Sequence, residues 1–406
     1  MKRSHYHLRR GCATLVGIVF FVAGVLKLMD PVGAGLVVDE YFKFFHTGFL
    51  AFAAKPVAVG LALLESLLGA ALITGSYRKL TAWITWILTA VFTVVTLILW
   101  LANPAMDCGC FGEAIHLTHF QTFAKNVVLL LLECVAFIPL RRLGRHRKYR
   151  VASFWLIAAS LVGLTVYTWM YIPPMDFTPF DLSSRLYESV KDEEELEPEI
   201  VSVFVYEKNG QEGTFTLNNL PDSTWTFVRA ETLEKENNLK EDNYPILTIT
   251  DAAGDLQDSL AVGKFVMAVS VPYPDRLDAD RWTQLATFLS QAGEAGFRPL
   301  LLTAATPQTL RIPEAVAPEA RGVLDACTYY SDYKTLLSLN RSNGGATYFH
   351  NGSLIEKWAR RALPSEKKLG RLVRNNATEV ELSASTKGRQ TFWGFFLYSF
   401  AVLFFL

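Results

Sequence analysis

Five long apolar segments dominate the first 172 residues of the chain. Each approaches the roughly 20 residues that a helix needs to cross the hydrocarbon core of a bilayer. The chain has 406 residues, of which 51% are hydrophobic and only 19% are charged, whereas soluble proteins average about 25% charged residues. We therefore predict a multi-pass α-helical membrane domain. Its spans are expected at about Gly11–Met29, Val57–Thr74, Leu80–Ala102, Phe120–Leu140 and Val151–Ile172.

Basic residues predict the orientation of these spans. They precede the first span, separate the second from the third, and separate the fourth from the fifth, so the positive-inside rule places all three clusters in the cytoplasm. We expect an inner-membrane protein with a cytoplasmic N-terminus, with Asp30–Pro56 and Asn103–His119 as external loops and residues 173–390 in the periplasm. The clusters are Lys2, Arg3, Arg9 and Arg10; Arg78 and Lys79; and Arg141, Arg142, Arg145, Arg147, Lys148 and Arg150.

The part of the chain after the fifth span has the pattern of a soluble α/β domain. Strands alternate with helices and end in a hairpin plus a helix, which predicts a thioredoxin-like α/β sandwich. The expected strands are Ile246–Thr250, Lys264–Val271, Phe297–Thr303, Ala346–Phe349 and Ser353–Trp358, and the expected helices are Asp278–Ala295, Asp332–Leu339 and Ser365–Asn375.

These patterns divide the chain into consecutive parts. A four-helix membrane domain covers residues 8–140, and a basic loop with the fifth span covers residues 141–172. Residues 173–244 hold a linker and a β-hairpin around Asn209 and Gly210. The α/β domain covers residues 245–376. The apolar tail, residues 391–406, is either a short sixth helix, a half-inserted anchor or an irregular chain end.

Cys108 and Cys110 flank a glycine in the second expected external loop. Two thiols one residue apart on an oxidising side of a membrane suggest a strained disulfide that is easily reduced, and hence thiol–disulfide exchange. The alternatives are a static disulfide that pins the loop and two cysteines lying among the lipid headgroups. Cys12 and Cys134 lie within spans and are expected to be packing residues. Cys327 is interpreted as a buried small residue or as a thiol that resolves a mixed disulfide.

Three charged residues fall within the spans. Glu65 lies in the middle of the second span and should face the bundle interior, protonated or paired, as a proton-handling or structural group. Glu133 lies near the inner end of the fourth span. Lys27 lies near the outer end of the first span, where its side chain is expected to reach the headgroups. Small residues that should let helices approach closely are Gly17, Gly24, Gly60 and Gly69.

The α/β domain lacks the cysteines of a thioredoxin. The expected Cys-x-x-Cys position after the second strand reads Val271-Pro272-Tyr273-Pro274-Asp275. The loop where thioredoxins place a cis-proline reads Ser342-Asn343-Gly344-Gly345-Ala346. We therefore expect this domain to bind or position a partner rather than to exchange electrons.

The membrane half resembles the DoxX/MauE-like family. The resemblance rests on the run from Phe21 to Pro31, on Glu65 and Gly75, on the Cys108-Gly109-Cys110-Phe111-Gly112 loop, and on Lys125-Asn126. It implies a four-helix membrane fold and, for the MauE branch, a role in methylamine dehydrogenase maturation, where many disulfides form. The whole architecture looks like a multidomain member of that family from Bacteroidetes-type bacteria.

Two functional hypotheses follow. The first is a membrane thiol–disulfide oxidoreductase, or an accessory to one, in which Cys108 and Cys110 are the redox pair and Glu65 is a possible proton-handling group. The second is a non-catalytic assembly protein that presents a degenerate thioredoxin-like domain. Expected partners are the lipid bilayer and a periplasmic client or redox protein. Nucleic acid is not expected, because basic and acidic residues both number 39. The sequence contains no evident cofactor or metal motif, and the electron acceptor, a quinone or another molecule, is left open.

Overall fold

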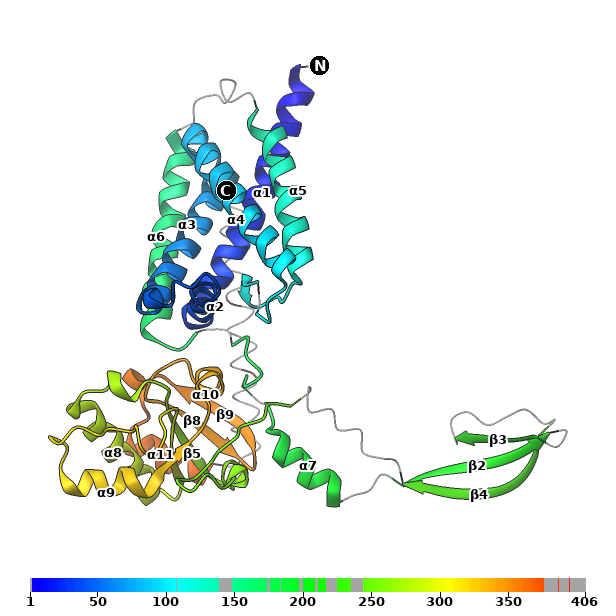
Figure 1. The fold of residues 1–406 in the computed structure, drawn as a ribbon, viewed down its shortest axis with the longest axis vertical. Coiled ribbons are helices and arrows are strands. Elements are labelled where there is room, and N and C mark those ends of the chain that lie inside the picture. Colours follow the sequence, from blue (N-terminus) through cyan, green and yellow to red (C-terminus); the bar gives the residue numbers. More distant parts are fainter. Residues whose placement is uncertain are drawn as a thin grey trace.

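A computed structural model describes residues 2–106, 108–138, 148–173, 176–182, 184–196, 200–208, 211–216, 225–234, 244–375, 386 and 394. The described chain has two main parts, a helical bundle and an α/β domain that lies against one end of it (Figure 1). The apolar tail lies outside the described residues apart from Gly394. The predicted architecture of a multi-pass helical region followed by an α/β domain is confirmed.

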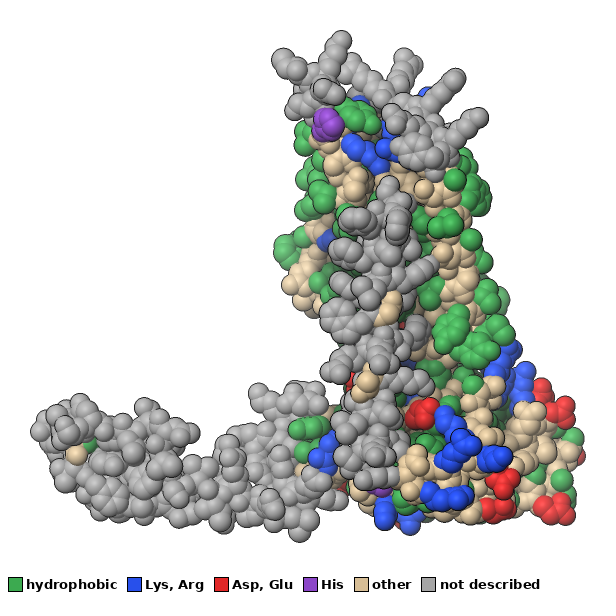
Figure 2. Space-filling view, turned by 180° about the vertical axis from the view of Figure 1, so that it is seen from behind, with side chains coloured by type: hydrophobic (Ala, Val, Ile, Leu, Met, Phe, Trp, Pro, Cys, Tyr) green, Lys and Arg blue, Asp and Glu red, His purple; other side chains and the backbone are tan. Residues whose placement is uncertain are grey.

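Five helices of the bundle are long and apolar enough to cross a membrane, among the residues described. Their apolar side chains remain exposed around the outside, as Figure 2 shows and as Trp83, Val94 and Leu156 exemplify. Such a surface is stable only in contact with lipid, so the chain is a multi-pass membrane protein. The helices are α1 (Lys2–Met29), α3 (Ala54–Thr74), α4 (Arg78–Ala102), α5 (His119–Phe137) and α6 (Lys148–Met170).

Glycines bring α1 and α3 into close contact. A Cβ atom added to Gly24 would lie 2.3 Å from the Ser66 hydroxyl oxygen, and one added to Gly69 would lie 2.4 Å from the Phe21 nitrogen. Gly17 is similarly close to Leu72. The predicted packing role is therefore confirmed for these three glycines. It is wrong for Gly60, since no heavy atom lies within 4 Å of the position of its added Cβ.

The expected external loop Asp30–Pro56 is instead largely helical. It contains α2 (Pro31–Phe44) and the 3-10 helix η1 (Gly48–Ala53), and α2 lies across the end of the bundle in Figure 1. The Asp30 carboxylate caps α2 by accepting a hydrogen bond from the Gly33 amide at 3.0 Å, and Pro31 occupies the first helical position. An Asp cap followed by proline is a helix-start signal. The apolar segment after it is short, and for that reason we did not predict a helix there.

The α/β domain is built on a five-stranded sheet of order β7-β6-β5-β8-β9. Strand β5 pairs in parallel with β6, β6 pairs in parallel with β7, and β5 and β9 both pair antiparallel with β8. A βαβ unit thus leads into a hairpin and a final helix, as a thioredoxin-like sandwich requires. The strands are β5 (Val266–Val271), β6 (Arg298–Thr303), β7 (Thr328–Tyr330), β8 (Gly345–His350) and β9 (Ser353–Trp358).

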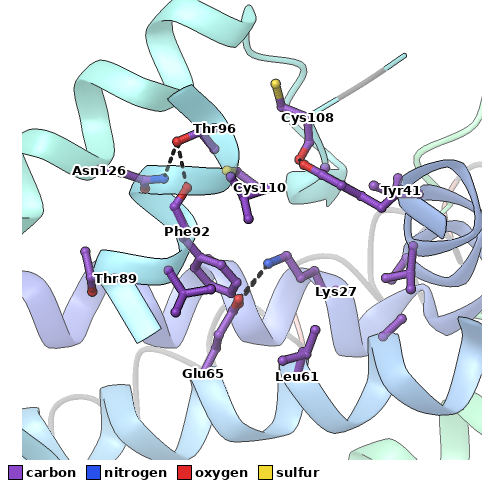
Figure 3. Close-up of a pocket in the computed structure, with 18 of the residues that line it drawn as sticks. Lys27, Tyr41, Leu61, Glu65, Thr89, Phe92, Thr96, Cys108, Cys110 and Asn126 are labelled. Carbon is purple, nitrogen blue, oxygen red and sulfur yellow. Dashed lines mark hydrogen bonds and ion pairs between the residues drawn. The ribbon is translucent and has the colours of Figure 1, made fainter. Parts of the chain in front are cut away.

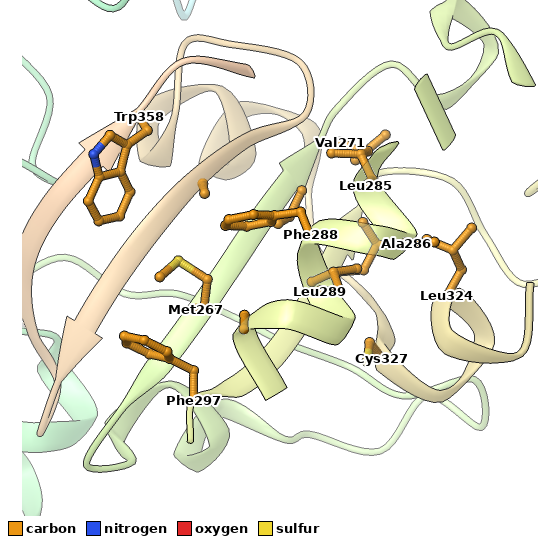
Figure 4. Close-up of a cluster of buried hydrophobic side chains, with 14 of the residues drawn as sticks. Met267, Val271, Leu285, Ala286, Phe288, Leu289, Phe297, Leu324, Cys327 and Trp358 are labelled. Carbon is orange, nitrogen blue, oxygen red and sulfur yellow. The ribbon is translucent and has the colours of Figure 1, made fainter. Parts of the chain in front are cut away.

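Side chains alternate between the two faces of β5. Met267, Val269 and Val271 join the core beneath α8 (Ala279–Glu294), α9 (Pro318–Cys327) and α11 (Glu366–Arg374), part of which Figure 4 shows. Val266 and Ala268 face the other layer, which contains α10 (Tyr333–Leu339) and the 3-10 helix η4 (Asp258–Val262). Of these elements, α10 lies nearest the bundle in Figure 1.

Several element predictions are refined by the structure. The expected strand at Ile246–Thr250 is wrong, because Thr250 forms only isolated bridges to Leu256 and Tyr330. The expected hairpin is confirmed as β2 (Ile200–Lys208) and β3 (Gln211–Thr216), and β4 (Thr226–Glu234) adds a third strand beside β2. Residues 209–210 of its turn lie outside the described residues. The expected linker contains a helix, α7 (Tyr187–Leu196).

Ion pairs join the α/β domain to the bundle. Arg341, after α10, contacts the Asp30 carboxylate at 2.6 Å, and the side chains of both residues are only 5% exposed. Lys334 of α10 contacts Glu40 of α2 at 2.8 Å, and Lys357 of β9 contacts Asp176 at 2.5 Å. These contacts fix the α/β domain against the end of the bundle that carries α2.

Candidate thiol site at the end of the bundle

Cys108 and Cys110 lie at the end of the bundle nearest the α/β domain. Cys110 begins the short strand β1 (Cys110–Glu113), and Cys108 lies just before it. This strand packs against α1 and α2. Arg10 of α1 and Arg78 of α4 lie at the other end of the bundle, where both bond to carbonyls at the C-terminal end of α3. The two cysteines and the α/β domain therefore share one end, as predicted, and two of the basic clusters share the other.

Gly109 has a backbone conformation that only glycine adopts readily here. Its φ is +58°, and an added Cβ would lie 2.2 Å from the Val37 Cγ1 atom of α2. The absence of a side chain therefore lets the cysteine loop turn sharply and pack directly against α2. Neither cysteine is joined in a disulfide in this structure.

Cys108 is buried and faces a histidine. Its sulfur lies 2.7 Å from the Nδ1 atom of His119, and Cys108 as a whole is only 5% exposed. The Nε2 atom of His119 lies 3.0 Å from the Pro104 carbonyl oxygen. Because a carbonyl only accepts hydrogen bonds, Nε2 carries a proton and Nδ1 is directed at the thiol. An imidazole placed in this way can accept the thiol proton and stabilise a thiolate.

The N-terminus of α5 holds His119 in place. Thr118 accepts a hydrogen bond from the Gln121 amide at 3.2 Å, and the Gln121 side chain accepts one from the Thr118 amide at 3.0 Å. This capping box fixes the first residue of the helix, which is His119. The free amides of a helix N-terminus also favour negative charge on a nearby thiolate.

Tyr41 of α2 fixes the backbone of the same loop. Its hydroxyl donates a hydrogen bond to the Cys108 carbonyl at 2.9 Å. Burial raises the pKa of Tyr41, and the nearby thiols of Cys110 and Cys108 raise it further, so the hydroxyl stays protonated and remains a donor. The loop is therefore held from both sides, by His119 at the sulfur and by Tyr41 at the carbonyl.

A cavity of about 280 Å³ opens beside the two cysteines. Most of its lining is apolar and comes from α1 to α5, and it includes Phe20, Phe92 and Leu129. The polar part of the wall includes Cys108, Cys110, Tyr41, Lys27 and Glu65, together with Thr89, Thr96, Lys125 and Asn126. Figure 3 shows the Cys108 sulfur pointing away from Cys110, and the Lys27–Glu65 pair on the opposite side of the cavity.

Lys27 and Glu65 form an ion pair inside the bundle. The Lys27 Nζ atom lies 2.9 Å from one carboxylate oxygen of Glu65 and 2.8 Å from the other. The side chains are 15% and 4% exposed, respectively. The interpretation that Lys27 reaches the headgroups is therefore wrong. A buried carboxylate is costly unless it is paired, and this pairing outweighs the tendency of lysine to extend toward water.

The remaining sequence candidates lie away from this site. Glu133 is buried and accepts a hydrogen bond from Thr89 at 2.7 Å. Cys12 packs in an apolar cluster near the opposite end of the bundle. Cys327 ends α9 and is 8% exposed in the core of the α/β domain, so the structure does not bring it to Cys108 or Cys110. Among the residues described, no group of three metal-ligating side chains is present.

His119 and Tyr41 were not among the site residues predicted from the sequence. His119 stands directly before the fourth span, where it reads as a boundary residue, and its partner Cys108 is 11 positions away. The Thr118–Gln121 capping pattern is the signal that places His119 at a helix start. Nothing in the sequence indicates that Tyr41 meets Cys108, since they are 67 positions apart.

Comparison with known proteins identifies the membrane half. Residues 6–140 match the family described as methylamine utilisation protein MauE. This segment is a MauE-like membrane domain. It contains both loop cysteines, Lys27 and Glu65, whereas α6 and the α/β domain follow it. Residues 200–237, which include the three-stranded sheet, match a family described as a domain of unknown function.

One curated relative matches a longer stretch of the chain than the MauE family does. The chain is 25% identical over 184 residues to Protein TlpB of Flavobacterium psychrophilum, which covers 44% of this chain and 49% of that protein. The chain thus spans about half the length of the curated relative it matches. No solved structure matches the chain.

Proposed function

We propose that Cys108 and Cys110 of the MauE-like domain form a thiol–disulfide couple that supports protein maturation on the periplasmic side of the inner membrane. The contact between the Cys108 sulfur and His119 Nδ1 at 2.7 Å carries this proposal. An imidazole that accepts the thiol proton produces the thiolate, which is the reactive form in thiol–disulfide exchange. The positive-inside rule favours the periplasmic side, because residues of two basic clusters, Arg10 and Arg78, lie at the other end of the bundle.

The adjoining apolar cavity supports a lipid-soluble acceptor of the quinone class. Oxidation of Cys108 and Cys110 forms one S–S bond and releases two electrons and two protons, and a quinone takes up both to become a quinol. Disulfide formation requires the Cys108 sulfur to turn from His119 toward Cys110. The disulfide then oxidises a pair of thiols in a client protein, which regenerates Cys108 and Cys110. Glu65 acts as a positioning residue, since it holds Lys27 at the cavity wall.

Thiol counting in the full chain tests this proposal. The reduced protein in native membranes is treated with decylubiquinone, a fully substituted quinone that accepts electrons without adding thiols to its ring, and the free thiols of the chain are counted after modification with a maleimide reagent. We expect two thiols to disappear in the wild type and none in the Cys108→Ser or Cys110→Ser variants. Cys12→Ser is the matched control and should lose the same two thiols. If the wild type keeps all its thiols, the redox proposal is wrong.

A second candidate function is that of a non-catalytic assembly protein. It is favoured by two loops of the α/β domain that are hydrogen-bonded to each other. The Asn343 amide joins the two loops where a thioredoxin would carry its active site: it accepts a hydrogen bond from the Tyr273 amide at 3.0 Å and donates one to the Tyr273 carbonyl at 2.9 Å. Neither loop contains cysteine. A Cys108→Ser/Cys110→Ser double variant that retains full function in cells would favour this candidate over the redox couple.

A further inference from the structure

A second cavity lies between the MauE-like domain and the α/β domain. Its volume is about 480 Å³. The bundle contributes residues of α2, η1, the start of α3 and the end of α6. The α/β domain contributes the two loops joined by Asn343, residues of α10, and Arg360 and Arg361. The cavity therefore lies where the two cysteine-free loops of the α/β domain face the membrane domain.

Five cationic side chains line this cavity. They come from both domains and face only one lining carboxylate, that of Asp39, which already pairs with Lys43 at 2.7 Å. Arg341 is also paired, through Asp30. The other four cations form no ion pair with any described residue. The five cations are Lys55, Arg276, Arg341, Arg360 and Arg361.

Arg341 has an unused donor at the cavity. One terminal nitrogen contacts Asp30 at 2.6 Å and the other donates to the Leu337 carbonyl at 3.2 Å. Its Nε atom is buried and has no hydrogen-bond partner among the described residues. Because a buried unpaired donor is costly, an acceptor that reached this nitrogen would stabilise the folded chain.

The other groups on the wall are also donors or are neutral. Arg276 lies over the Tyr273 ring, and Lys55 lies 4.5 Å from the centre of the Trp169 ring, so neither is charge-neutralised by these contacts. The Tyr273 and Tyr333 hydroxyls bond to each other. Burial raises the pKa of Tyr333, and its hydrogen bond to Tyr273 adds to the rise, so it remains a neutral donor.

The rim toward the bundle is apolar and aromatic. Phe52 is 77% exposed and Trp169 is 45% exposed, and both line the cavity. Exposed aromatic side chains at the end of a span are typical of the headgroup level of a bilayer. In Figure 2, Lys and Arg side chains, with Asp and Glu side chains among them, lie on the α/β domain below the apolar surface of the bundle. Basic and aromatic surfaces thus meet at the level where lipid phosphates lie.

We propose that this interdomain cavity binds a phosphate-type anionic group, presented by an anionic membrane lipid whose acyl chains rest against the aromatic rim. Phosphate oxygens match the planar donor sets of Arg276, Arg341 and Arg360, and an anionic group would offset part of the positive charge of the four unpaired cations. A bound lipid would touch both domains, so it would stabilise their association. The site does not depend on the chemistry of Cys108 and Cys110.

Thermal unfolding of the full chain in detergent tests this site. Three probes are added separately: dioleoyl phosphatidylglycerol, dioleoyl phosphatidylcholine and inorganic phosphate. We expect the phosphatidylglycerol to raise the unfolding temperature by about 3–8 °C and the zwitterionic lipid to raise it far less. A response to inorganic phosphate as large as that to phosphatidylglycerol would support the anion site and identify a free phosphate group, rather than a lipid, as its occupant.

A matched pair of double variants locates the effect. Arg276→Gln/Arg361→Gln removes two exposed cations from the cavity, and Arg298→Gln/Arg311→Gln removes two exposed arginines of the same domain elsewhere. The first should lose at least half of the lipid-induced shift, and the second should keep it. If neither anion stabilises the wild type, or if both variants lose the shift equally, the proposed site is wrong.

Discussion

Asp30 and Arg341 are 311 positions apart and form a buried ion pair at 2.6 Å between the membrane domain and the α/β domain. Asp30 also caps α2, so one carboxylate both starts that helix and holds Arg341. Gly33 makes the approach possible, since a Cβ atom there would lie 2.4 Å from an Asp30 carboxylate oxygen and 3.0 Å from the Arg341 guanidinium. The Glu113 carboxylate of β1 lies 4.0 Å from Arg341, which links the cysteine loop to the same junction.

Asp30→Asn should weaken the junction strongly. The amide keeps an oxygen that can cap α2 but leaves the buried Arg341 charge with only the Glu113 carboxylate, 4.0 Å away, as a counter-charge, which costs up to about 3–5 kcal/mol. Hydrogen exchange of α10 in the full chain should measure faster opening. Lys334→Met is the matched control, because Lys334 is 73% exposed and such a pair contributes at most about 1 kcal/mol. Equal exchange rates for Asp30→Asn and wild type would contradict the assigned role.

Glu65→Gln should destabilise the bundle. It leaves the Lys27 ammonium group, which is 15% exposed, without its counter-charge, at a cost of about 3–5 kcal/mol. Replacing both partners, in Lys27→Met/Glu65→Leu, should recover most of this loss because no unpaired charge remains. The fraction of protein that stays folded after heating in detergent measures both effects. A double variant less stable than Glu65→Gln would show that the pair has a different role.

His119→Gln should slow the reaction of Cys108 with iodoacetamide by about tenfold at pH 7, because the imidazole that accepts the thiol proton is lost. The Cys110→Ser background removes the neighbouring thiol, and peptide mass spectrometry follows Cys108 alone. His116→Gln is the control, since His116 is an exposed histidine of the same loop. A rate unchanged by His119→Gln would remove the basis for thiolate formation at this site.

Cys327 should behave as a buried core residue with a characteristic pH dependence. An unfolded thiol titrates near about pH 8.5, and burial raises the pKa of Cys327 in the folded chain. The stability that its burial contributes is therefore full below the unfolded pKa and is lost as the pH rises through the folded pKa.

Maleimide at pH 8 should modify Cys110 in the native chain and reach Cys327 only after unfolding. Equal labelling rates would mean that Cys327 is accessible.

Local sequence determined the helical spans and most of the α/β elements. The signals involved are local. Long apolar segments predict α4 and α5, and the caps Asp278 and Asp332 act on backbone amides a few residues further along the chain. Asp278 accepts from the Arg281 amide at 3.0 Å and Asp332 from the Thr335 amide at 2.9 Å, as their positions predict. Helix α2 was not predicted. Its cap, Asp30, and its first residue, Pro31, are local signals of a helix start, but its apolar face is short and lies against other helices.

Tertiary structure alone decided which distant groups meet. The sequence marked Cys108, Cys110, Glu65 and Lys27 as candidates because thiols in a loop and charges in a span are conspicuous. The pairing of Lys27 with Glu65 depends on how α1 packs on α3, and the arginine-lined cavity depends on where the α/β domain docks. Neither is a local property of the chain, because the free energy of burying a charge is set by the partner that the fold brings to it.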